Sequence, residues 1–270
     1  MERVKANLWK CKFRLLCAFH ALLVLALPAN PLYAQPQLVD LTHPFDETTI
    51  YWPTNKTFHL ESVFAGRTDK GYWYESNDLT ASEHGGTHLD APAHFAEGRW
   101  HIDDIPLESL IAPGVVIDIR NRVKNKPDTR ILPEDILNWE KNHGRIAKGS
   151  IVLVLTGWEA FWPNKKLYLG TDKPGDVDNL HFPGFSKEAA ELLSHERKVA
   201  AVGLDTPSLD YGQSKDFPAH RVFGAANIPG FENVCQLAML PPKGFRVIAL
   251  PMLIGKGSGA PLRIVAEIGP

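Results

Sequence analysis

The sequence predicts an α/β fold in which one mixed sheet forms a single strand-rich domain with few helices. Short apolar runs recur along the chain, as they do in strands that are buried on both faces. Only two segments have helical patterns, and we find neither an internal repeat nor a linker that divides the chain. We therefore expect one domain over residues 35–270.

The first strand is predicted at residues 37–41, and the alternating segments 58–64 and 72–80 follow as two more. The apolar runs at residues 115–119 and 151–155 are typical of buried strands. Three further strands complete the predicted set, at residues 199–204, 245–250 and 262–268.

A helix is predicted at residues 133–140, because proline and acidic residues occupy its first turn. A second helix is expected over residues 186–193, with Ser186 as its N-cap. Between them, residues 165–179 are predicted to form a long polar surface loop.

Residues 1–34 have the order of a secretory signal peptide: basic residues, an apolar run at residues 15–27, then small residues up to Ala34. The run is shorter than the roughly 20 residues that span a bilayer, although a signal anchor remains the alternative. Cleavage after Ala34 would place the protein outside the cell or in the periplasm, depending on the host, with no further membrane contact.

Cleavage would remove Cys11 and Cys17 and leave Cys235 alone, so the mature chain would hold no internal disulfide. The apolar neighbours of Cys235 predict a buried, inert thiol. Asn55 lies in a glycosylation motif that is meaningful only in a eukaryotic host.

Composition excludes one class of partner. With 44% hydrophobic and 22% charged residues, the chain is ordinary for a soluble globular protein. Its formal net charge of −2 argues against a nucleic-acid partner, because such proteins carry a basic face.

The stretch SEHGGTHLDAPAHF predicts a metal or catalytic site. Its side chains His84, His88, Asp90 and His94 are separated by even numbers of residues, so an extended chain would direct all of them to one face. A straight strand would separate the outer ligands by roughly 20 Å, so the chain must curl, and the two glycines permit this. We expect His84, His88 and Asp90 to hold the metal and His94 to act as an acid or base. The alternative is a Gly-rich loop with surface histidines.

A second half of the site is predicted after the later strands, at His220 and Glu232. Glu232 has apolar neighbours, where an unpaired carboxylate would cost several kcal/mol to bury, so a cation is expected beside it. Alternatively, Glu232 is exposed or pairs with Arg221 or Arg246.

The histidine-rich stretch resembles the signature of the cyclase family, which includes bacterial kynurenine formamidase and isatin hydrolase. The resemblance extends to the segments VDLTHP, YWP, TGW and GLDTPS and to the pair His220 and Glu232, so it covers almost the whole mature chain. It implies a swivelling β/β/α fold, a homodimer or larger homo-oligomer, and one or two divalent ions, Zn²⁺ or Mn²⁺.

The resemblance also implies roles for individual residues. Asp90 matches a ligand that bridges two ions, and His94 matches the catalytic histidine. His220 and Glu232 match positions that complete the second site in members with two metals. In isatin hydrolase, described with one manganese, these positions remain close to the substrate.

The implied reaction is hydrolysis of an aromatic amide or formamide C–N bond. A divalent ion would activate water, and His94 would take its proton and return it to the leaving nitrogen. Four aromatic residues are predicted to contact the substrate, with Trp162 also near the cavity, although each could instead be a packing residue. The four are Trp52, Trp73, Phe95 and Trp158.

Two features bear on the substrate. The pair Thr54 and Asn55 stands where formamidases tend to have Gly-Asp, and a signal peptide is unusual for tryptophan catabolism. An arylformamidase-like activity is the main prediction, and an isatin hydrolase-like lactam hydrolase is the alternative. A third possibility is that the chain is not an enzyme but a secreted binding or structural protein that has kept the fold and lost catalysis.

Overall fold

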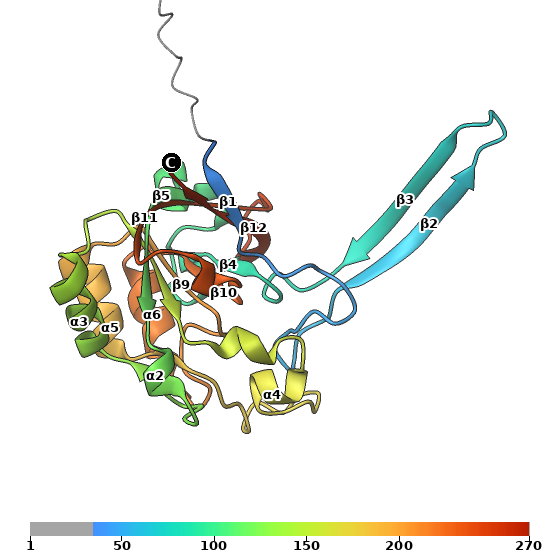
Figure 1. Ribbon diagram of the computed structural model, residues 1–270. Helices are drawn as coiled ribbons and strands as arrows, with labels where there is room; N and C mark the ends of the chain where they lie inside the picture. Colours follow the sequence, from blue (N-terminus) through green and yellow to red (C-terminus); the bar gives the residue numbers. More distant parts are fainter. Residues whose placement is uncertain (1–34, 270) are drawn as a thin grey trace, which may run out of the picture. The chain divides into compact units, whose positions relative to one another are not determined.

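The computed structural model describes residues 35–269. Eight strands form one mixed sheet in the order β1-β12-β11-β5-β7-β9-β10-β4 (Figure 1). Because β4 also pairs with β12, the sheet closes on itself. Strands β5, β7, β9 and β10 run parallel, and the other pairings are antiparallel. The predicted mixed-sheet α/β class is confirmed, and the predicted signal peptide lies outside the described residues.

The strands of this sheet are mostly short. Their bounds are β1 Gln37–Asp40, β4 His88–Asp90, β5 Ile111–Asp118, β7 Ile151–Leu155, β9 Ala201–Leu204, β10 Gly230–Glu232, β11 Lys243–Pro251 and β12 Gly259–Ile268. A separate parallel pair consists of β6 Arg130–Ile131 and β8 Gly184–Phe185.

The helices are short, and α3, α5 and α6 lie together beside the sheet (Figure 1). The α-helices are α1 Leu107–Leu110, α2 Arg120–Val123, α3 Pro133–His143, α4 Lys165–Leu169, α5 Lys187–Glu191 and α6 Pro218–Ala225. A π-helical turn, Leu192–Arg197, continues α5. The 3₁₀ turns are η1 Pro92–His94, η2 Ile102–Asp104, η3 Trp158–Phe161 and η5 Leu237–Met239. Among residues 35–269, no helix has the length and apolar character needed to cross a membrane.

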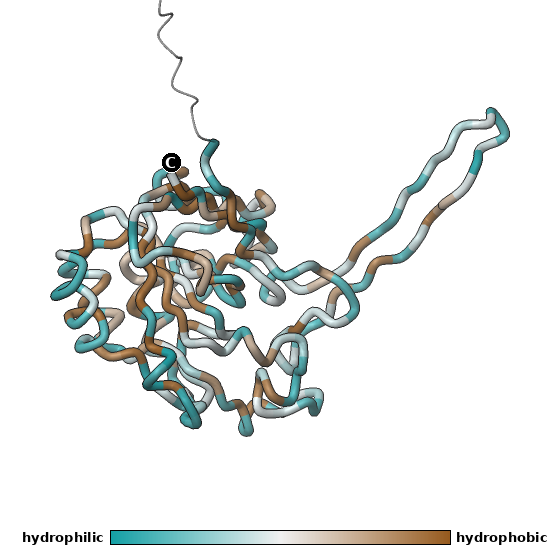
Figure 2. Tube along the Cα trace, viewed as in Figure 1, coloured by the Kyte–Doolittle hydropathy of each residue, from teal (hydrophilic) through white to brown (hydrophobic). Residues whose placement is uncertain are grey.

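The apolar core lies on both sides of the sheet, and strand β7 shows why. Val152 and Val154 belong to one buried cluster, whereas Ile151, Leu153 and Leu155 belong to the other. Successive side chains of a strand point to opposite faces, so a strand covered on both sides needs an uninterrupted apolar run. The same strands appear as hydrophobic segments inside the domain (Figure 2).

The structure confirms both predicted helices. The Ser186 hydroxyl accepts a hydrogen bond from the Ala189 amide at 3.1 Å, as an N-cap does. The prediction of a continuous surface loop at residues 165–179 is wrong at its start, where α4 forms and buries Tyr168 and Leu169 completely. The Tyr168 hydroxyl donates to the backbone oxygen of Asp205, which explains why a chain rich in polar residues turns inward there.

Strands β2 His59–Arg67 and β3 Trp73–Thr80 form an antiparallel hairpin that extends away from the sheet (Figure 1). Almost all of its side chains are exposed. A two-stranded hairpin is at best marginally stable by itself in water, and this one carries several large exposed apolar side chains. They are Leu60, Val63, Phe64, Tyr72, Trp73, Tyr74 and Leu79.

Candidate metal centre and active site

The two glycines of the histidine-rich stretch let the chain curl, as predicted. Gly86 has a positive φ of +59°, which side chains larger than hydrogen rarely adopt. A Cβ added to Gly85 would lie 2.0 Å from the Tyr51 ring, so only glycine fits against that side chain. The curl brings His84 back beside strand β4.

The first group of predicted ligands converges. His84 Nδ1 lies 2.6 Å from Asp90 Oδ1, and His88 Nε2 lies 3.2 Å from the same oxygen. One donor atom from each of the three residues fits within 4.8 Å of the others. Because His88 and Asp90 are two residues apart on β4, their side chains share one face of the strand.

A second group shares Asp90 with the first. His220 Nε2 lies 3.2 Å from Asp90 Oδ2 and 3.2 Å from Glu232 Oε1. These three residues also offer donor atoms within 4.8 Å of one another. Glu232 lies directly opposite His88 in the β4–β10 pairing, and its Oε2 is 3.4 Å from His88 Nε2. All five predicted ligands therefore meet, with Asp90 at the centre.

The alternative partners proposed for Glu232 are engaged elsewhere or absent from its contacts. Arg246 pairs with Glu267, and no ion pair joins Arg221 to Glu232 in the described part of the chain. Glu232 Oε1 instead accepts a hydrogen bond from the Leu209 amide at 2.8 Å.

Asp210, which was not among the predicted site residues, orients His220. Its Oδ2 lies 2.6 Å from His220 Nδ1 and accepts the His220 amide, while Oδ1 accepts the Ala219 amide. Asp210 thus satisfies amides in the first turn of α6 and fixes which ring nitrogen of His220 faces Asp90 and Glu232. The helix itself was not predicted, although Pro218 at its first position is a typical helix start.

The buried charges of the cluster are balanced by protons in the metal-free protein. Burial opposes a charge on His88, but the nearby Asp90 and Glu232 outweigh it and raise the His88 pKa to about 9. The same balance, with Asp210 as the main partner, raises the pKa of His220 well above its usual value. Burial and the charge of Asp90 raise the Glu232 pKa. Against burial, the neighbouring histidines, His84 first, hold the Asp90 pKa well below its usual range.

A divalent cation fits this cluster. His88 Nε2 is buried and has no hydrogen-bond partner among residues 35–269, although two carboxylates lie within 3.4 Å of it. Buried polar atoms normally have partners, so this nitrogen points to a missing one. Imidazole and carboxylate donors suit Zn²⁺ and Mn²⁺, and metal binding would replace the protons on the histidines.

His94 lies beside the ligands and belongs to neither group of three. It ends η1, and its ring stacks on the His84 ring with centroids 3.8 Å apart and an interplanar angle of 21°. Burial lowers the His94 pKa to about 4, so the ring is neutral at pH 7 and can accept a proton. This placement is consistent with the predicted acid/base role.

A cavity of about 260 Å³ opens onto the ligands and His94. Trp52 and Phe95 line it, as predicted for substrate contacts, and so do Tyr51 and Phe217, which were not among the predicted contacts. Phe217 stands just before α6 with a positive φ of +47°, a local strain that no sequence pattern indicates.

Three of the proposed aromatic residues lie elsewhere. Trp73 is on the β2–β3 hairpin and 61% exposed. Trp158 is buried in the core, where its indole N–H donates to the Tyr168 backbone oxygen at 2.7 Å. Trp162 packs against the core and stacks on His43. The structure does not bring these three to the cavity.

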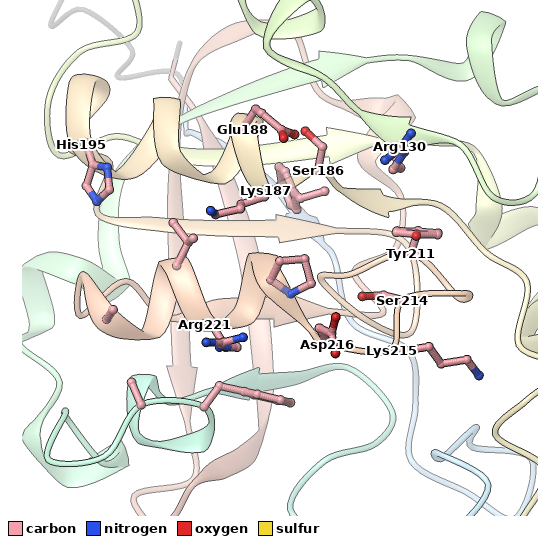
Figure 3. A pocket seen from close by; sticks show the side chains of 16 residues that line it. Arg130, Ser186, Lys187, Glu188, His195, Tyr211, Ser214, Lys215, Asp216 and Arg221 are labelled. Carbon is pink, nitrogen blue, oxygen red and sulfur yellow. The ribbon is translucent and has the colours of Figure 1, made fainter.

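A larger cavity, of about 710 Å³, lies beside α5 and α6 (Figure 3). It shares Phe95 with the smaller cavity and is lined by basic side chains from three elements, Arg130, Lys187 and Arg221. None of the residue groups that could hold a metal in residues 35–269 lines it, so size alone does not identify the active site.

Comparison with known proteins agrees with the geometry. The sequence is 31% identical to isatin hydrolase of Roseibium aggregatum over 243 residues, covering 83% of this chain and 90% of the relative. It is 28% identical to kynurenine formamidase of Salinibacter ruber over 235 residues, covering 86% and 98%. The solved structure of isatin hydrolase A from Ralstonia solanacearum superposes with a TM-score of 0.78 at 32% identity, covering 86% and 92%.

The profile of the family described as "Putative cyclase" matches residues 39–211, which is more than half of the chain. The resemblance that the motifs indicated is thereby confirmed, and the chain belongs to the cyclase family of metal-dependent hydrolases.

Proposed function

We propose that this chain hydrolyses the C–N bond of a small aromatic amide or formamide, in the manner of an arylformamidase. The observation that carries the proposal is the sharing of Asp90 between two ligand groups, buried except for the half-buried His84, at the wall of an aromatic cavity. The relatives named isatin hydrolase and kynurenine formamidase support an aromatic amide as the substrate class.

The cofactor in this proposal is one or two ions of Zn²⁺ or Mn²⁺, held by His84, His88, Asp90, His220 and Glu232. When bound, a divalent ion supplies Lewis-acid polarisation of a carbonyl and lowers the pKa of water toward neutrality. Metal analysis of the purified protein distinguishes this enzyme from a non-catalytic protein on the same fold, which has no need of a stoichiometric ion.

The chain's own groups supply the proton transfers and the orientation of the substrate. Neutral His94 accepts the proton of the attacking water and returns it to the leaving nitrogen. Trp52, Phe95 and Phe217 offer flat apolar surfaces for an aromatic ring and exclude water around it. Asp210 holds His220 in its tautomer.

A lactam hydrolase like isatin hydrolase is the second candidate. Asn55, where formamidases tend to have aspartate, lines the cavity and donates from its side-chain amide to the His84 backbone oxygen at 3.1 Å. An amide there offers no negative charge to the amino group of a kynurenine-type substrate, which favours an uncharged lactam.

Giving the metal-loaded protein N-formyl-L-kynurenine and isatin separately, and following product absorbance, tests both candidates. Turnover of the formamide supports the first, and turnover of isatin alone supports the second. Turnover of neither substrate, in protein that holds its metal, contradicts both.

The partner proposed for the hairpin is a second copy of this chain, giving a homodimer or larger homo-oligomer. Phe64 and Tyr74 pack on one face of the hairpin with ring centroids 5.7 Å apart, and both are exposed in the single chain. Covering these side chains with another subunit would supply the burial that a lone hairpin lacks. Light scattering of the eluting protein measures the mass directly, and a monomer at micromolar concentration contradicts this part of the proposal.

Secretion is proposed from the order of charged, apolar and small residues in the first 34 positions. N-terminal sequencing of protein recovered from the native host tests it. The expected first residue is Gln35, and a chain that retains residues 1–34 in the cytoplasm contradicts the proposal.

A further inference from the structure

A second cluster of metal-type side chains lies outside the active site. His43, Glu159 and Cys235 each offer one donor atom, and these atoms lie within 4.8 Å of one another. His43 follows β1, Glu159 is in η3, and Cys235 follows β10. None of the three lines the 260 Å³ cavity, so the cluster is separate from the site described above.

His43 has an unsatisfied ring nitrogen in this cluster. The side chain is 8% exposed, and its buried Nε2 has no hydrogen-bond partner in the part of the chain that the structure describes. Its ring stacks on Trp162 with centroids 4.1 Å apart and an interplanar angle of 9°, which fixes the orientation of the imidazole. Burial lowers the His43 pKa to about 4, so the ring is neutral and keeps a lone pair that can bind a cation.

Cys235 and Glu159 add a sulfur donor and an oxygen donor to the nitrogen donor of His43. Cys235 is 3% exposed and forms no disulfide with any residue that the structure describes. Burial, then the charges of Glu159 and Asp40, raises its pKa to about 12. Glu159 Oε2 accepts a hydrogen bond from the Gln236 amide at 2.8 Å, and no other described residue donates to the second carboxylate oxygen. A divalent cation bound between Cys235 and Glu159 would neutralise the charges of a thiolate and a carboxylate.

We propose that His43, Glu159 and Cys235 form a binding site for a borderline-soft divalent ion of the Zn²⁺ class. Binding forms one bond each to nitrogen, oxygen and sulfur, and the Cys235 thiol releases its proton to solvent. Thiolate with imidazole and carboxylate is a donor set that Zn²⁺ accepts, and Mg²⁺ and Ca²⁺ prefer oxygen alone. No redox change accompanies the binding.

This ion would stabilise the segments that support the active-site strands β4 and β10. The His43 amide donates to Thr87 Oγ1 at 2.9 Å, and that hydroxyl donates to the Asn233 backbone oxygen at 2.7 Å. Thr87 precedes β4 and Asn233 follows β10, the two strands that present His88, Asp90 and Glu232. The second ion is therefore structural, and it is independent of the reaction proposed above.

Cobalt(II) substitution tests the proposal, because a thiolate bound to Co²⁺ gives a charge-transfer band in the near ultraviolet and the catalytic ligands include no thiolate. The full chain loaded with Co²⁺ is expected to show this band. Cys235→Ser, which keeps the size of the side chain, should lose the band and one equivalent of bound metal while keeping amide hydrolysis. The Cys11→Ser/Cys17→Ser double variant is the matched control and should keep the band.

Loss of the active-site ions distinguishes the two metal centres. Asp90→Ala should abolish hydrolysis and keep the cobalt–thiolate band. The proposed metal site at Cys235 is therefore tested independently of the proposed hydrolase activity. A cobalt-loaded wild-type chain without the band overturns the proposal. So does a band that persists in Cys235→Ser, because the thiolate would then come from elsewhere.

Discussion

Two antiparallel strand pairs of this protein, β4–β10 and β2–β3, differ in length and in burial. The first spans three residues on each side, and every one of them is buried. The second spans nine and eight residues and is exposed along almost its whole length. Strand β4 also pairs with β12 and β10 with β9, so closure of the sheet covers the short pair. Pairing with neighbouring strands, more than strand length, therefore decides where buried charged side chains can be held.

The largest effect is expected at the centre of the short pair. Asp90→Ala removes the carboxylate shared by both ligand groups, so we expect loss of the catalytic metal and of hydrolysis to the background rate. Elemental analysis with a steady-state assay checks both. The matched control is Asp78→Asn, an exposed carboxylate on β3, which should change neither. Full activity of Asp90→Ala would contradict the assignment of Asp90 to both ligand groups.

His94→Ala is expected to reduce kcat/KM by about 10²- to 10⁴-fold, the usual contribution of a general acid or base. His94 lies outside both ligand groups, so metal content should stay near the wild-type value. Assay and metal analysis of the same preparation check this. A parallel loss of metal would make His94 a ligand and contradict the role assigned to it.

Asp210→Asn is expected to weaken metal affinity by about 10- to 100-fold, as changes of residues that orient metal ligands commonly do. The amide can still fill the space, but it no longer holds the His220 ring with a charged acceptor. Competition with a chelator measures the affinity. An unchanged affinity would show that His220 contributes no metal bond.

The stability of the metal-free protein should depend on pH through His88. Its folded pKa of about 9 exceeds the ordinary value of 6.5, so its stabilising contribution is full below pH 6.5 and is lost as pH rises toward 9. His220 acts in the same direction. Thermal melting of the metal-free protein should therefore give a Tm that falls over this range.

The metal-loaded protein provides the control for that pH dependence. Metal displaces the proton of His88, so its Tm should not show the same decline. A metal-free Tm that rises steadily from pH 6.5 to 9 would contradict the balance of charges described for the cluster.

The smallest effect on catalysis is expected at the hairpin. Trp73→Ser should leave kcat and KM unchanged at a protein concentration that saturates the oligomer, because Trp73 lies outside the cavity. It should weaken self-association, since a large aromatic side chain at an interface contributes about 2 kcal/mol or more when it is a central contact. Sedimentation equilibrium of wild type and variant measures this. A changed KM in the fully associated variant would restore Trp73 as a substrate contact.

The sequence could predict those site residues that lie close together along the chain. His84, His88 and Asp90 are close in sequence, and the glycines between them show where the chain turns. The buried strands were also predictable, because an uninterrupted apolar run such as that of β7 is typical of a strand covered on both faces of a sheet.

The parts that could not be predicted depend on distant packing. Asp210 acts through its contact with α6, and nothing in its own neighbours indicates that contact. Trp73 and Trp52 are both aromatic residues near predicted strands, yet one lies on an exposed hairpin and the other lines the cavity. Alternation along β2 and β3 predicts strands correctly but does not tell whether either face is covered.

The position of Asp90 between the two ligand groups also bears on how the protein would load its metal. Oδ1 faces His84 and His88, while Oδ2 faces His220. An ion held by one ligand group would draw on the Asp90 charge that the other group would offer to its own ion, so the two occupancies would be thermodynamically coupled and the later of these two active-site ions would bind more weakly. At a low concentration of free metal the protein would then hold one active-site ion, and at a high concentration it would hold two. The metal supply would thus set the number of bound ions without any change in the fold.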